Sequence, residues 1–110
     1  QWIATKSIHA AEFFHGTIEM TEKDMSFMLF KGEDETRPLV DRVEAFVRRY
    51  SDVVEVWDTK DYKLEGIDED MRKFVAPMVL AAQNERISAH FEHVRNHNLD
   101  IRRYYRTVEY

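Results

Sequence analysis

The sequence predicts an α/β fold with a parallel sheet, and three consecutive segments carry this prediction. Residues 26–30 (SFMLF) form a short unbroken apolar run, and residues 53–57 (VVEVW) form a second short segment rich in valine. Runs of this length favour strands, and unbroken apolarity is typical of parallel strands that are covered on both faces. The intervening residues 36–50 carry apolar side chains at helical spacing, namely Leu39, Val43, Phe46, Val47 and Tyr50. Strand, helix and strand in this order predict a right-handed βαβ unit.

Signals at the segment ends predict where two of the helices begin and end. Thr36 is a candidate N-cap for the middle helix, and Pro38 lies in its first turn, where a missing N–H is tolerated. Residues 7–15 (SIHAAEFFH) favour a short helix, with Ser7 as its N-cap and Gly16 as its C-terminal stop.

A long helix is predicted from about residue 68 to residue 97. Pro77 is expected to kink this helix or to mark the start of its main part. Apolar residues recur at helical spacing and predict a core-facing stripe, which comprises Met71, Phe74, Val75, Met78, Val79, Ala82, Ile87, Phe91 and Val94. The tail at 98–110 is dense in arginine and tyrosine and is expected to be irregular.

Composition and charge argue against several classes of protein. The 44% hydrophobic and 34% charged residues are ordinary for a globular domain. No apolar run approaches the ~20 residues of a membrane span. The chain contains no cysteine, which excludes disulfide scaffolds and cysteine-based zinc sites and favours a cytoplasmic location. The net charge of −5 argues against non-specific binding to nucleic acid.

Length and the first residues favour part of a larger protein. A chain of 110 residues is one domain at most. It starts with glutamine, and Gln1-Trp2-Ile3 resembles the end of an apolar element without a preceding cap. Two parallel strands alone leave sheet edges open, so we expect further strands from sequence that precedes Gln1.

Three segments together resemble a known family. They are QWIATKSIHAAEFFHG at 1–16, GEDETRPLVDRVEAFVRRY at 32–50 and RNHNLDIRRYYRTVEY at 95–110. They resemble the fructosamine-6-phosphate deglycases of the fructoselysine-6-phosphate type, which are SIS (sugar isomerase) proteins related to the isomerase domain of glucosamine-6-phosphate synthase. The resemblance implies a three-layer αβα fold with a parallel sheet, in which residues 1–110 form the C-terminal part of the second SIS domain. Thr17 stands where the family usually has proline, which removes no functional group.

The resemblance implies a cytoplasmic enzyme of carbohydrate metabolism. Its reaction would cleave a 6-phosphofructosamine, an Amadori product, to glucose 6-phosphate and an amino acid, with a sugar-phosphate substrate, no cofactor, no metal, and a homodimer or higher oligomer. The family's catalytic acid and phosphate loops correspond to sequence before Gln1. The chain alone is therefore expected to be inactive and to need the remaining N-terminal part of the protein. The alternatives are an isomerising glutamine-fructose-6-phosphate aminotransferase, a phosphosugar isomerase and a non-catalytic SIS sugar-phosphate sensor.

His15 and Glu12 are the candidate catalytic residues. Histidine titrates near neutral pH, which suits ring opening and proton transfer between carbons. The resemblance places the family's catalytic histidine at His15. Glu12 lies three residues earlier on the same helical face and can orient or charge-stabilise the imidazole. The residues by themselves leave open a helix cap or a subunit contact for His15 and a solvated surface position for Glu12.

Arg103 and Arg106 are the candidate substrate-binding residues. They belong to a cationic tail in an otherwise acidic chain, and guanidinium groups pair well with phosphate or carboxylate. The alternative is a tail packed by salt bridges to acidic neighbours such as Asp100 and Glu109.

A metal site is not predicted. His90, His93 and His97 recur on one helical face, at a spacing that can ligate a metal ion. However, three ligands from a single helix rarely close a tetrahedral site, and no carboxylate group stands out beside them.

Overall fold

The structure is a computed structural model that describes residues 4–98, 100, 104 and 107 of the chain. Residues 6–80 form one compact unit, and residues 81–98 belong to a second. Among the described residues, no helix combines the length and the apolarity that crossing a bilayer requires.

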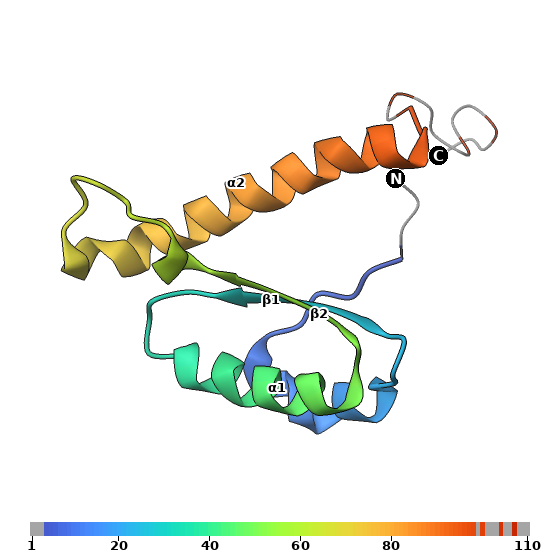
Figure 1. The fold of residues 1–110 in the computed structure, drawn as a ribbon, viewed down its shortest axis with the longest axis horizontal. Coiled ribbons are helices and arrows are strands. Elements are labelled where there is room, and N and C mark those ends of the chain that lie inside the picture. Colours follow the sequence, from blue (N-terminus) through green and yellow to red (C-terminus); the bar gives the residue numbers. More distant parts are fainter. Residues whose placement is uncertain (1–3, 99, 101–103, 105–106, 108–110) are drawn as a thin grey trace. The chain divides into compact units, whose positions relative to one another are not determined.

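The first unit is built on a parallel two-stranded sheet. Strand β1 (Ser26–Lys31) pairs with strand β2 (Val53–Asp58), and helix α1 (Arg37–Tyr50) connects them along one face of the sheet (Figure 1). The predicted strands and the helix between them are therefore confirmed. The α/β fold class follows from this unit.

The core of the first unit lies between α1 and one face of the sheet. Its buried side chains are Phe13, Val43 and Val47, and the two valines lie one turn apart on α1. Partly buried residues of both strands pack against them, namely Phe27, Leu29 and Val54. Successive strand residues point to opposite faces, so the other face carries the partly exposed Met28, Phe30 and Val53.

The two strands pair residue for residue. Ser26 lies opposite Val53, and Lys31 lies opposite Asp58, so both strands end at the same level. A short 3₁₀ helix, η3 (Thr59–Asp61), follows β2 directly, and the Asp58 carboxylate accepts a hydrogen bond from the backbone N of Lys60 at 2.9 Å. The common end of the strands brings the loop after β1 and the connection after β2 to one edge of the sheet.

The short helix before the sheet differs from the expected one. It is a 3₁₀ helix, η1 (Ala10–His15), and its N-cap is His9, whose Nδ1 accepts a hydrogen bond from the backbone N of Ala11 at 3.2 Å. The prediction that Ser7 caps it is therefore wrong, because the ring of His9 supplies the acceptor. Gly16 ends η1 as predicted, and a second 3₁₀ helix, η2 (Thr17–Met20), follows.

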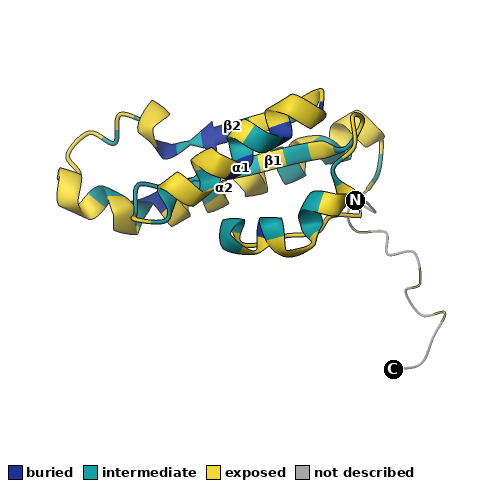
Figure 2. Cartoon of the chain, turned by 90° about the horizontal axis from the view of Figure 1, so that it is seen from below, coloured by how far each residue is buried: buried dark blue, intermediate teal, exposed yellow. Residues whose placement is uncertain are grey.

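Helix α2 (Glu69–Arg95) is continuous and contains Pro77 in its interior. The predicted core-facing stripe is wrong in part, because Phe74 is 62% exposed and Met78 is 71% exposed. Figure 2 shows many exposed positions along α2. Ala76 is the buried residue of α2. Other members of the stripe, such as Val75 and Val79, are partly buried, so helical periodicity marks apolar positions of which only some are shielded.

Candidate functional site

The two candidate catalytic residues lie on η1. In a 3₁₀ helix, residues three positions apart eclipse each other, so Glu12 and His15 share one edge. Both are exposed, whereas Phe13 between them is 3% exposed and belongs to the core. Among the described residues, no hydrogen bond or ion pair joins Glu12 to His15. The arrangement places both polar groups at the surface on a short helix whose centre is anchored in the core.

The remaining candidates of the sequence lie in the second unit or outside the described residues. Arg103 and Arg106 lie outside the described residues. In the part of the chain that the structure describes, no group of three His, Asp or Glu side chains is placed to hold a metal ion. His97 follows the end of α2, where its backbone N donates to the carbonyl of Glu92 at 3.0 Å.

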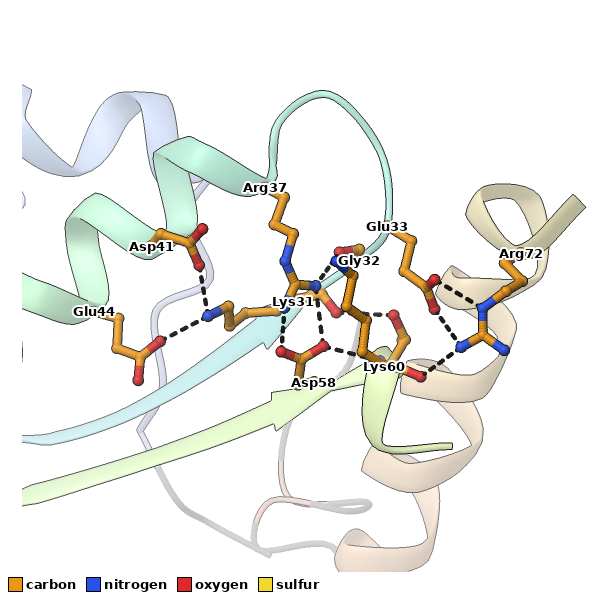
Figure 3. Close-up of polar contacts among 10 residues, drawn as sticks. Lys31, Gly32, Glu33, Arg37, Asp41, Glu44, Asp58, Lys60 and Arg72 are labelled. Atoms are coloured by element: carbon orange, nitrogen blue, oxygen red, sulfur yellow. Dashed lines mark hydrogen bonds and ion pairs between the residues drawn. The ribbon is translucent and has the colours of Figure 1, made fainter. Parts of the chain in front are cut away.

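A polar cluster at the carboxyl ends of β1 and β2 is the most highly connected arrangement of charges in the first unit (Figure 3). Arg37, the first residue of α1, donates to the carbonyl of Gly32 at 2.8 Å and to both carboxylate oxygens of Asp58. The side chains of Arg37 and Asp58 are each 18% exposed. The hydrogen bond from Arg37 lowers the pKa of Asp58, against the opposing effect of burial. Arg37 thus joins the loop after β1 to the end of β2.

Lys31, the last residue of β1, forms a second part of this cluster. Its Nζ lies 2.5 Å from a carboxylate oxygen of Asp41 and 2.9 Å from one of Glu44, both on α1. Burial lowers the pKa of Lys31, but the hydrogen bonds with Asp41 and Glu44 outweigh it and raise that pKa. The pKa of Glu44 is lowered by its hydrogen bonds from Lys31 and Arg48. Lys31 therefore links β1 to α1 as a paired cation.

Arg72 on α2 forms the third part. Its Nε and Nη2 donate to the two oxygens of Glu33 at 2.8 and 2.7 Å. The same guanidinium donates to three carbonyls of the connection after β2, those of Thr59, Tyr62 and Lys63. The hydrogen bond from Arg72 lowers the pKa of Glu33. One side chain thus fixes the loop after β1, the connection after β2 and the first turn of α2.

The loop between β1 and α1 is also ordered from within. The Asp34 carboxylate accepts from the backbone N of Thr36 at 2.7 Å and from its Oγ1 at 2.5 Å. These two hydrogen bonds lower the pKa of Asp34. Thr36 precedes α1 as predicted, but its own side chain makes no capping hydrogen bond, and its hydroxyl donates to Asp34 instead.

The charged groups of this cluster bind one another and connect the ends of the strands to the neighbouring loops and helices. The carboxyl ends of parallel strands are where open α/β sheets commonly bind ligands. Here, however, Lys31, Arg37 and Arg72 are each paired with at least one carboxylate, so none of these three offers an unpaired cation to an anionic ligand. The sequence does carry a signal for the cluster, since Lys31 and Asp58 are charged residues placed directly at the ends of the two predicted strands.

The lowered carboxylate pKa values predict a loss of stability in acid. Glu33, Glu44 and Asp58 have folded pKa values below those of the unfolded chain, which are about 4. Their contribution is therefore complete above about pH 5 and is lost as the pH falls below about 4. We expect the melting temperature to be level between about pH 6 and 8 and to fall steeply below about 4, as measured by circular dichroism. In the Asp58→Asn variant the melting temperature should fall less steeply with decreasing pH. If the melting temperatures of the two proteins fall equally steeply, this carboxylate has no such role.

Comparison with known proteins relates the chain to sugar-phosphate enzymes. No family model matches it. The fructosamine deglycase FrlB of Bacillus subtilis (strain 168) is 37% identical over 110 residues, which is the whole of this chain and 34% of that protein. The fructoselysine 6-phosphate deglycase of Escherichia coli (strain K12) is 31% identical over 104 residues, which is 94% of this chain and 29% of that protein. The chain thus spans about a third of the length of the curated relatives it matches.

Solved structures agree with the sequence comparison. The crystal structure of a candidate phosphosugar isomerase from Bacillus subtilis matches with a TM-score of 0.91 at 37% identity, over 100% of this chain and 34% of that one. One from Salmonella typhimurium LT2 matches with a TM-score of 0.88 at 33% identity, over the same shares of the two chains. These matches confirm the expected fold class and the resemblance to fructosamine deglycases.

Proposed function

We propose that the chain forms part of an enzyme that processes a sugar phosphate. The premise is that the chain is a relative of the fructosamine deglycases and shares its fold with phosphosugar isomerases. The observation that carries this proposal is the 37% identity to a fructosamine deglycase, which extends over the whole chain and includes the segment around His15. Two such deglycases, from different organisms, match nearly the same stretch.

The specific reaction that we propose is cleavage of a 6-phosphofructosamine by water to glucose 6-phosphate and an amino acid. His15 would assist ring opening or protonate the departing amine, because imidazole can take and give a proton near neutral pH. Its exposed position on an anchored helix supports this role, since the ring can reach a ligand while its backbone is held by the buried Phe13. Glu12, one 3₁₀ turn earlier, would orient the imidazole or stabilise its positive charge once a ligand is bound.

Binding of the phosphate group is proposed to lie away from the ends of β1 and β2. The cations of the polar cluster already have carboxylate partners, so a phosphate would have to displace an ion pair to bind there. Arg103 and Arg106 remain the candidate substrate-binding residues of this chain. We further propose that residues 1–110 act as the C-terminal part of a second SIS domain, within a homodimer or higher oligomer in the cytoplasm.

The second candidate function is isomerisation of a phosphosugar. It is favoured by the solved structures, both of which are described as candidate phosphosugar isomerases. The two functions differ in their products. A deglycase releases an amine together with glucose 6-phosphate, whereas an isomerase interconverts an aldose and a ketose phosphate and releases no amine.

An assay with two substrates tests the proposal. The protein that carries this chain, at its full length, is incubated with fructoselysine 6-phosphate and separately with fructose 6-phosphate. We expect glucose 6-phosphate and lysine in equal amounts from the first substrate and little turnover of the second. The chain of 110 residues assayed alone should be inactive. Turnover confined to fructose 6-phosphate would favour the isomerase, and full activity of the 110-residue chain would refute a partial site.

A further inference from the structure

The backbone at His15 is constrained on both sides. On the N-terminal side, Phe13 is buried with Val43 and Val47 of α1. On the C-terminal side, Gly16 has a φ of 144°, a conformation that side-chain-bearing residues rarely adopt. The backbone N of Glu19 then donates to the carbonyl of Gly16 at 3.0 Å and continues the chain into η2. His15 therefore occupies a corner between two short helices, and that corner depends on packing against α1.

Phe14, the residue directly before His15, is held by three neighbours. Its ring meets that of Phe13 edge to face at a centroid distance of 5.1 Å and that of Phe46 at 5.8 Å. The guanidinium carbon of Arg42 lies 4.3 Å from the centroid of the Phe14 ring. Edge-to-face aromatic pairs and cation–π contacts both restrain a ring in place. Phe46 and Arg42 lie one turn apart on α1, so two successive turns of one helix hold this ring.

Arg42 differs in its contacts from the arginines of the polar cluster. It is exposed, and among the described residues its contact is the ring of Phe14 and not a carboxylate. Its stacking on that ring is therefore the contact through which Arg42 acts on η1. The matched residue for comparison is Arg49, which is also exposed and lies two turns further along α1.

We infer that Phe14, held against α1 by Phe46 and Arg42, is a positioning residue for His15, and that Arg42 acts through it. The inference rests on the proposed catalytic role of His15. A general acid or base works only within hydrogen-bond reach of the proton that it moves. A displacement of about 1 Å can lower a rate by about 10²-fold. Loosening the Phe14 ring would move the His15 backbone in this way while leaving the substrate contacts elsewhere intact.

The test uses Phe14→Leu, Arg42→Met and the control Arg49→Met in the full-length protein, assayed with fructoselysine 6-phosphate. We expect kcat to fall about 10- to 100-fold in Phe14→Leu and about 3- to 10-fold in Arg42→Met, with KM changed less than about 2-fold. Arg42→Lys retains a cation but loses the planar guanidinium, so its kcat should lie between that of Arg42→Met and that of the wild type. Arg49→Met should leave kcat unchanged. An unchanged kcat in Phe14→Leu would overturn the inference.

A second measurement separates this inference from the proposed function. The ¹⁵N heteronuclear NOE of the His15 and Gly16 amides reports backbone motion on the picosecond to nanosecond timescale and requires no substrate. We expect it to fall in Phe14→Leu and in Arg42→Met and to stay unchanged in Arg49→Met. If the wild type turns over no fructosamine phosphate but the NOE still falls in Phe14→Leu and Arg42→Met, the proposed function is wrong and the positioning of the His15 backbone by Phe14 stands. If kcat falls in Arg42→Met while the NOE is unchanged, Arg42 acts directly and the positioning is wrong.

Discussion

Replacing His15 with asparagine in the full-length protein is expected to lower kcat for a fructosamine 6-phosphate by roughly 10²–10⁴-fold, the usual effect of losing a general acid or base. Asparagine keeps a hydrogen-bonding side chain of similar reach but cannot exchange a proton near neutral pH. KM should change little, because phosphate recognition is proposed to lie elsewhere. Steady-state kinetics measures both constants. Since His15 is exposed, the fold should tolerate the change.

His9 provides the matched control for this prediction. It lies at the other end of η1, is also exposed, and acts there as the N-cap. Asparagine is among the favoured N-cap residues, so His9→Asn should keep η1 and leave kcat within about 2-fold of the wild type. A near-wild-type kcat in His15→Asn, or a loss of activity that follows a lowered melting temperature, would show that His15 has a structural role only.

The βαβ unit could be predicted because its determinants are local. The apolar runs of β1 and β2 end at Lys31 and Asp58, and the amphipathic pattern between them allows a single arrangement of strand, helix and strand. The type of η1 could not be predicted in the same way. A 3₁₀ helix and a short α-helix share a similar pattern over so few residues, and its cap, His9, is not a residue type that sequence rules select.

The ion pairs of the polar cluster could not be predicted, although Lys31 and Asp58 mark the strand ends, because the partners are distant in sequence. Arg37 and Asp58 are 21 residues apart, and Glu33 and Arg72 are 39 residues apart. The Arg37–Asp58 pair can form because the parallel register ends both strands at one level, which periodicity does not encode. The exposure of Phe74 was predicted wrongly for a different reason. Helical periodicity placed Phe74 in a core-facing stripe, but whether a residue is buried also depends on what packs against it, which periodicity does not encode.

Replacing Arg37 with methionine is expected to cause the largest loss of stability among the charged residues of α1. The substitution keeps an unbranched apolar stem but leaves Asp58 without its cation and the carbonyl of Gly32 without its donor. Removing one partner of a well-shielded ion pair is costly because the other charge stays desolvated, and with both side chains 18% exposed we expect about 2 kcal/mol. Urea denaturation followed by circular dichroism measures the free energy of unfolding.

Both the pH dependence and a control on the same helix test the cause of this loss. Without Arg37 the folded pKa of Asp58 should rise, so the variant has less stability to lose in acid. The difference in the free energy of unfolding between wild type and variant should therefore be largest near pH 7 and should decrease as the pH falls below about 4. The control Arg48→Met removes an i,i+4 ion pair with Glu44. The side chain of Arg48 is 51% exposed, so the substitution should lower the free energy of unfolding by less than about 0.5 kcal/mol. If the difference in the free energy of unfolding between wild type and Arg37→Met does not change with pH, Arg37 stabilises the chain by packing of its stem and not by its charge.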